Sequence, residues 1–259
     1  MIIQMLPLFR KGTILTEEML EAVKQYALDY VNLVTDGYSD GIVKGCELDV
    51  RDGILTIGRG IVRFENQTYM IPSELHMEFQ PVKQESAVKI LFRDETRTKN
   101  FLYREAEIIF SDTLAKRNAE IEVCRFKLQE GAKLRRDYQN YADYITEFDT
   151  VNVVHADWAS YGGKTISPEV LRAFVNEAGN VPLTEAVDVA FCQQVLGLKG
   201  ETMNREALCF YIRNRLGKCE ENCSNLELYQ QLGKILELIK QKPKEKDAQP
   251  VRRQRFVIS

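Results

Sequence analysis

The chain has 259 residues, of which 44% are apolar and 28% are charged, and its formal net charge is −3. This length suffices for one large or two ordinary domains that bury their own cores. The near balance of charge gives no general attraction to nucleic acid or to a membrane surface, and no apolar run approaches the roughly 20 residues of a membrane span. The start, MIIQMLPLF, lacks the basic residues, long apolar centre and cleavage site of a signal peptide, so we expect folding in the cytoplasm.

Residues 1–37 predict an N-terminal segment followed by one amphipathic helix, from about residue 13 to residue 37. Thr16 is a suitable N-cap for this helix, and Gly37 is a suitable residue to terminate it. Apolar residues recur every three or four positions and form one face, made of Leu20, Val23, Ala27, Tyr30, Val31 and Val34. The apolar start MIIQMLPLF is either a contact site for another protein or the first strand of the next domain.

Residues 38–155 change to a period of two, which is typical of strands. CELDV, AVKILF, EAEIIF and EIEVCRFKL alternate, and the second run places Val88, Ile90 and Phe92 on the side opposite Lys89. In EIEVCRFKL the inward phase slips between Val123 and Cys124, as a β-bulge requires. Turn sequences separate the runs, and GRG at 58–60 predicts a hairpin turn. We predict an antiparallel β sandwich or barrel.

Residues 156–240 predict a helical domain, since four apolar patterns of period 3.6 follow residue 166. The predicted fold class is therefore α+β: an N-terminal helix, an antiparallel β sandwich or barrel, then a C-terminal helical bundle. Four basic residues, Arg205, Arg213, Arg215 and Lys218, gather on or after the third helix of this domain. Such a helix could read nucleic acid, but we favour a solvated polar face because the neighbouring CEENC is acidic.

The motif Gly162-Gly163-Lys164-Thr165 resembles the end of a nucleotide-binding P-loop. The spacing fails, because Trp158 stands where the first glycine of that loop belongs. Ser167-Pro168 also begins the next helix after the Lys and Thr, whereas a P-loop places both in the first helical turn. We expect a turn between two domains, with Lys164 and Thr165 as decoys for a cofactor site.

The chain contains six cysteines, at positions 46, 124, 192, 209, 219 and 223. In the cytoplasm we expect them to be reduced. Cys192, Cys209, Cys219 and Cys223 could together form a four-sulfur zinc site, with the last two as a C-x₃-C pair. Zinc sites prefer tighter paired spacings, and Cys192 and Cys209 have no nearby partner in sequence, so we expect no metal and no cofactor.

The tail, residues 241–259, is basic and rich in Pro, Lys and Glu, so it is expected to be extended in isolation. Its end, RFVIS, could add a strand to the sheet of another subunit, or the whole tail could be solvated.

Three stretches resemble one family: LPLFRKGTILTEEMLEAV, YSDGIVKGCELDVRDGILTIGRGIVRFENQTYMI and IEVCRFKLQEGAKLRRDY. In this order, over about residues 5 to 140, they are similar to baseplate and tail-fibre-adaptor proteins of contractile phage tails and of phage-derived contractile injection systems. The resemblance implies a structural protein with no catalytic residues to transfer. It also implies other baseplate, spike or tail-fibre subunits as partners, several copies in one particle, and assembly in the cytoplasm. The helical domain is not covered.

The expected function is thus a structural component of a contractile-tail baseplate rather than an enzyme, with no membrane and no nucleic-acid partner. Two alternatives stay open. One is an NTP-binding enzyme that uses Lys164 and Thr165, and the other is a nucleic-acid-binding module built on the third helix of the helical domain and the basic tail.

Overall fold

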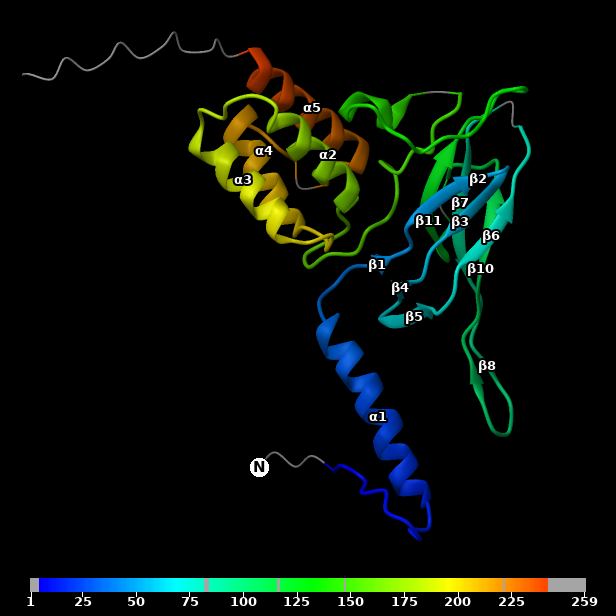
Figure 1. Ribbon diagram of the computed structural model, residues 1–259. Coiled ribbons are helices and arrows are strands. Elements are labelled where there is room, and N and C mark those ends of the chain that lie inside the picture. The colour runs from blue at the N-terminus through cyan, green and yellow to red at the C-terminus, as the bar shows by residue number, and fades with distance from the viewer. Residues whose placement is uncertain (1–4, 82–83, 116, 147, 221, 242–259) are drawn as a thin grey trace, which may run out of the picture.

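The structure is a computed structural model that describes residues 5–81, 84–115, 117–146, 148–220 and 222–241. The predicted α+β class is confirmed: one helix comes first, antiparallel strands fill the middle, and helices follow (Figure 1). Residues 1–4 of the apolar start and residues 242–259 of the basic tail lie outside the described part of the chain.

The described helices are α1 (Glu17–Val34), η1 (Tyr141–Ile145, a 3₁₀ helix), α2 (Pro168–Ala178), α3 (Ala186–Gly197), α4 (Arg205–Leu216) and α5 (Asn225–Gln241). The strands are β1 (Gly41–Gly45), β2 (Leu48–Arg51), β3 (Ile54–Ile57), β4 (Gly60–Phe64), β5 (Gln67–Ile71), β6 (Leu75–Glu78), β7 (Ser86–Phe92), β8 (Thr96–Arg97), β9 (Leu102–Tyr103), β10 (Ala106–Ser111) and β11 (Glu120–Phe126).

All strand pairs in these sheets are antiparallel, in the orders β1-β4-β5, β2-β3-β6, β10-β7-β11 and β8-β9. Aromatic side chains join the sheets: Phe64 of β4 stacks on Phe92 of β7 with ring centroids 4.2 Å apart, and Phe79, just after β6, meets Phe126 of β11 edge-on. The described strands form packed sheets and no closed barrel.

The GRG segment at residues 58–60 does not form the predicted hairpin turn. It connects β3 to β4, which belong to different sheets. Hydrogen bonds from Cys46 N to Arg59 O and from Gly58 N to Glu47 O continue the pairing across the gap, so two long strands bend together from one sheet into the next. A Cβ on Gly60 would lie 2.7 Å from the backbone nitrogen of Cys46 and 2.8 Å from the carbonyl oxygen of Lys44, so this bend requires glycine.

The central strand β7 is buried on both faces. Val88, Ile90 and Phe92 face the core as predicted, but Lys89 is also buried. Its ammonium donates to the carbonyls of Thr113 and Ala115, each at 2.8 Å, and pairs with the Glu120 carboxylate at 2.8 Å. The predicted bulge is confirmed, since the pairing of β11 with β7 shifts between Glu122 and Cys124.

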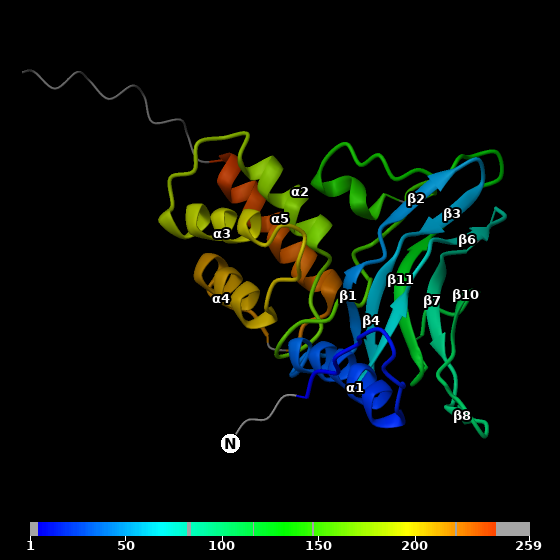
Figure 2. The same cartoon turned by 60° about the horizontal axis from the view of Figure 1, so that its bottom comes forward.

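Helices α2 to α5 pack beside the sheets as a bundle (Figure 2). Ser167 caps α2 as the sequence predicts, Asn204 caps α4, and Gly217 ends α4 in the left-handed conformation. The buried apolar side chains of the sheets and of these helices form one continuous cluster.

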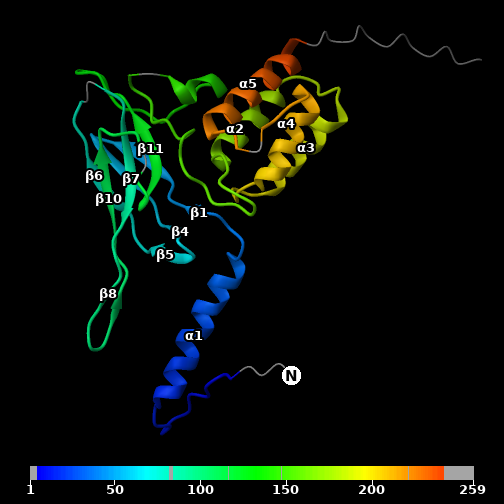
Figure 3. The ribbon, with the colours of Figure 1, turned by 180° about the vertical axis from the view of Figure 1, so that it is seen from behind.

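The sheets and the helix bundle together form the body of the molecule, and helix α1 stands apart from it. It projects away from the sheets and the bundle, as views from opposite sides show (Figures 1 and 3). The predicted N-cap at Thr16 is confirmed, whereas the helix ends at its C-cap Thr35, two residues before the predicted end at Gly37. None of the described helices is both long and apolar enough to cross a lipid bilayer.

Candidate functional site

The apolar face predicted for α1 is formed and left uncovered except at Val31, which is half-buried. None of its 18 residues is buried. Leu20, Val23 and Tyr30 on that face are 56%, 48% and 63% exposed. Because burial of such side chains is the main stabilising term in protein association, this face is a candidate contact surface.

The base of α1 is fixed to the sheet by one buried arginine. The guanidinium of Arg63, on β4, donates to Thr35 Oγ1 at 3.0 Å, to Tyr38 O at 3.1 Å and to Asn66 Oδ1 at 3.0 Å. Arg63 and Thr35 are both buried, and the planar guanidinium holds three acceptors in fixed directions. The end of α1 nearest the body is therefore held in one direction, while the rest of the helix projects.

Two further apolar segments are exposed. The segment before α1 exposes Met5, Leu6, Leu8, Phe9, Ile14 and Leu15. The β8-β9 hairpin exposes Phe101, Leu102 and Tyr103. The hairpin and α1 extend from the same end of the molecule (Figures 1 and 3). Sequence reasoning missed the hairpin, although FLY at 101–103 is an apolar run inside a charged stretch.

The Gly162–Thr165 motif forms a tight turn. Gly162 and Gly163 have φ of 79° and 141°, and Gly163 N donates to Ser160 O. The Lys164 ammonium pairs with the Asp157 carboxylate at 3.3 Å, and Thr165 is fully buried. The Lys164 ammonium is therefore paired within the fold, Thr165 is enclosed by the fold with no hydrogen-bond partner for its Oγ1 among the described residues, and the turn precedes the capped start of α2.

The basic residues predicted as one solvated face of α4 divide into two groups. Arg213 and Lys218 are exposed. Arg215 lies against α3 and pairs with the buried Asp188 carboxylate at 3.0 Å, and Arg205 donates to Lys164 O at 2.6 Å. The predicted cluster is corrected to this extent, since two of its four members hold the fold together.

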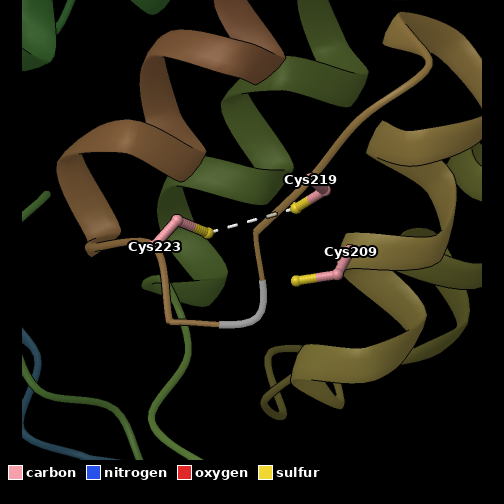
Figure 4. A group of neighbouring side chains, drawn as sticks. All are labelled: Cys209, Cys219 and Cys223. Carbon is pink, nitrogen blue, oxygen red and sulfur yellow. Dashed lines mark hydrogen bonds between the residues drawn. The ribbon is translucent and has the colours of Figure 1, made fainter.

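Three of the four cysteines considered for zinc lie together. The sulfurs of Cys209, Cys219 and Cys223 all lie within 4.8 Å of one another, whereas Cys192 on α3 is outside this group (Figure 4). Cys209 comes from α4, and the other two flank the loop that leads to α5. Burial, reinforced by the neighbouring Cys209 and Cys223 thiols, raises the pKa of Cys219 to about 12.

No protein-family model matches the chain, and no curated protein matches it. The solved structures that share a loose likeness with the chain include the following three. The crystal structure of TssK is 9% identical, with 92% of this chain and 69% of that chain covered and a TM-score of 0.43.

The other two are assemblies. A chain of the type VI secretion system TssK-TssF-TssG baseplate subcomplex, seen by cryo-electron microscopy, is 12% identical, with 90% of this chain and 99% of that chain covered and a TM-score of 0.36. A chain of the baseplate complex from the type VI secretion system is 10% identical, with 93% of this chain and 70% of that chain covered and a TM-score of 0.34.

Proposed function

We propose that this chain is a structural, non-catalytic subunit of the baseplate of a contractile tail or a related injection system, and that it binds a neighbouring subunit through α1. The sequence resemblance over about residues 5 to 140 supports the kind of particle. The observation that carries the binding role is the uncovered apolar face of α1.

Helix α1 has few stabilising interactions within the chain, which supports a partner that binds it. Its 18 residues make a helix of about 27 Å. Local side-chain interactions are few: Thr16 Oγ1 accepts from Met19 N at 3.3 Å, the Lys24 ammonium pairs with the Glu21 carboxylate at 2.6 Å, and Gln25 Nε2 donates to Asp29 Oδ1 at 2.6 Å. Most helical stability in proteins comes from packing an apolar face, and α1 packs none of its residues fully. A partner that covers this face supplies the stabilisation that the isolated chain lacks.

The spacing of the face indicates the shape of the partner. Leu20, Val23, Ala27, Tyr30 and Val34 alternate steps of three and four, the spacing that packs a helix against another helix or into an apolar groove. The helix contains four acidic residues and one basic residue, for a net charge of −3. Two parallel copies of α1 would repel each other, so the partner is a different surface, apolar in the centre and basic at its rim.

The β8-β9 hairpin supports a second contact at the same end of the molecule. Its exposed Phe101, Leu102 and Tyr103 are aromatic or apolar, and aromatic side chains are enriched at protein interfaces. A subunit that reaches both α1 and the hairpin buries more area than one that reaches either alone.

The test is incorporation into particles. Cells that assemble contractile particles would produce either the unchanged chain or the double variant Val23→Glu/Tyr30→Glu, and sheath-containing particles would be isolated by sedimentation. We expect the unchanged chain to sediment with the particles. We expect the double variant to be depleted from them by about 100-fold or more, since two buried charges would each cost at least about 1.4 kcal/mol of binding.

The matched control adds the same two charges to the opposite side of α1, as Gln25→Glu/Asn32→Glu. Successive residues turn by about 100°, which places positions 25 and 32 away from the apolar face. Incorporation of the control at the normal level, with loss of the first variant, supports the proposal. Equal incorporation of both variants, or absence of the unchanged chain from the particles, refutes it.

A further inference from the structure

The three-cysteine group in the helical bundle has the dimensions of a metal site. Tetrahedral Zn²⁺ binds thiolates at about 2.3 Å, which sets neighbouring sulfurs about 3.8 Å apart. The sulfurs of Cys219 and Cys223 are 4.0 Å apart, and Cys209 completes a triangle in which no separation exceeds 4.8 Å. Small rotations of the side chains would bring all three into range of one ion, since all three sulfurs lie beside one another in one gap between α4 and the loop (Figure 4).

We propose that Cys209, Cys219 and Cys223 bind one Zn²⁺ through their thiolates, with the fourth coordination position facing the neighbouring cleft. Each thiol releases its proton to solvent on binding. The site is independent of the binding role of α1.

A positive charge lies beside the sulfurs. Arg205 Nη2 is 3.7 Å from Cys223 Sγ and also donates to the Cys223 carbonyl, while Nη1 of the same guanidinium donates to Lys164 O. Three thiolates around Zn²⁺ carry a net charge of −1, which this guanidinium offsets. Donors to the ligating sulfurs orient them and tune the bound metal.

The fourth position has access to solvent. Cys209 lines a cleft of about 720 Å³ together with Gly162, Lys164, Glu206 and Asn222. Zinc sites with three protein ligands keep a water in the fourth position, and this cleft can admit one. No histidine and no fourth cysteine belongs to the group within the described residues.

The ion would fasten the connection between two helices. Cys209 lies within α4, Cys219 follows its end at Gly217, and Cys223 immediately precedes Ser224, which caps α5 through reciprocal hydrogen bonds with Glu227. One ion therefore ties the α4-α5 loop to α4 and fixes the start of α5.

The experiment uses the full chain, purified with a reductant and without chelators. Its metal content would be measured by mass spectrometry, and Co²⁺ would then be titrated into the metal-free chain without oxygen. We expect one Zn²⁺ per chain, a sulfur-to-cobalt charge-transfer band that saturates at one Co²⁺, and displacement of Co²⁺ by Zn²⁺.

Single variants identify the ligands. Cys209→Ser, Cys219→Ser and Cys223→Ser are each expected to lower the affinity by about tenfold or more, the loss that follows even when only a hydrogen-bond partner of a metal ligand is removed. Cys192→Ser is the matched control, since it removes a thiol of the same bundle that lies outside the group. It is expected to bind one ion with unchanged affinity.

A second readout covers variants that fail to fold. In the unchanged chain, alkylation of each cysteine would be followed by peptide mass spectrometry. Zn²⁺ is expected to slow labelling of Cys219, which is only half-buried, because the thiolate that would attack the reagent is bound to the ion. The proposal is overturned if the reduced chain contains no metal and gives no cobalt band, or if a Cys219-Cys223 disulfide forms in place of the metal site. It is equally overturned if only Cu(I) binds, or if Zn²⁺ is retained when two of the three cysteines are replaced.

Discussion

Helices α1 and α5 have similar lengths and similar apolar patterns but opposite surroundings. In the 17 residues of α5, Leu228, Leu232, Ile235 and Ile239 are buried in the bundle. In the 18 residues of α1, no side chain is buried. The same pattern therefore gives an apolar face that is buried in the bundle in α5 and an apolar face that is exposed in α1. The pattern predicts that a helix has a contact face, and only the structure shows whether that contact lies within the chain.

The contrast between the body and α1 is sharpest for charged groups. Lys89→Met leaves the buried Glu120 carboxylate without its ammonium partner, so we expect the free energy of unfolding to fall by about 3–5 kcal/mol. Denaturant titration measures the change. Lys24→Met on exposed α1 is the control, with an expected change within about 0.5 kcal/mol. A cost below about 1 kcal/mol for Lys89→Met would contradict the buried pair.

Apolar truncations compare the two helices directly. Leu232 in α5 is fully buried, and we expect Leu232→Ala to cost about 2–5 kcal/mol because it leaves a cavity. Leu20→Ala in α1 removes a side chain that is 56% exposed, so the isolated chain should lose no more than about 0.5 kcal/mol. Similar costs for the two variants, measured by denaturant titration, would show that α1 packs on the body.

Acid should destabilise the body through Asp143. The Arg135 guanidinium, which donates to both carboxylate oxygens, holds the pKa of Asp143 well below its ordinary value of 3.8. As the pH falls through about 4, Asp143 becomes protonated in the unfolded chain but stays ionised in the folded chain. The free energy of unfolding that this carboxylate contributes at neutral pH is therefore lost.

The matched variant is Asp143→Asn. It should cost about 1.5–3 kcal/mol at neutral pH, because hydrogen bonds to a charged group are lost. Its stability should also decline less steeply than that of the unchanged chain between pH 4 and pH 2, measured by thermal unfolding across pH. Parallel pH profiles for the two chains would be inconsistent with the Arg135 contact.

The smallest expected effect concerns the junction between the body and α1. Arg63→Lys keeps the charge but cannot hold Thr35, Tyr38 and Asn66 together, so we expect a loss of about 1 kcal/mol in global stability. Hydrogen exchange should accelerate in residues 35–38 while the amides of β7 stay protected. Unchanged exchange at residues 35–38 would mean that Arg63 does not hold α1 in place.

Local patterns predicted much of the fold. Period 3.6 located the four helices of the bundle, and the phase slip at Val123 and Cys124 located the bulge in β11, because both depend on neighbouring residues. The burial of Lys89 could not be predicted, since its acceptors on Thr113 and Ala115 lie 24 and 26 residues away and face it only after the sheet forms.

In the candidate sites too, features that depend on neighbouring residues could be predicted, and features that depend on the packing of distant segments could not. The apolar face of α1 followed from spacing alone, but its exposure depends on where the helix leaves the body. Grouping of Cys209 with Cys219 and Cys223, and separation of Cys192, depends on how α3 and α4 pack, which sequence spacing does not encode. Arg63 had no signal in the sequence, because it is an isolated charge in an apolar strand and two of its three acceptors, Thr35 and Tyr38, come from a distant segment.

The most direct test of the central claim is hydrogen exchange in residues 17–34, compared between the free chain and the assembled particle. In the free chain α1 should exchange quickly, since little packing protects it. In the particle, exchange at the same amides should slow by about 100-fold or more, as expected when a partner covers the apolar face and stabilises the helix by about 2.7 kcal/mol. Equal exchange in the two states would show that no subunit binds α1 and would contradict the proposed role.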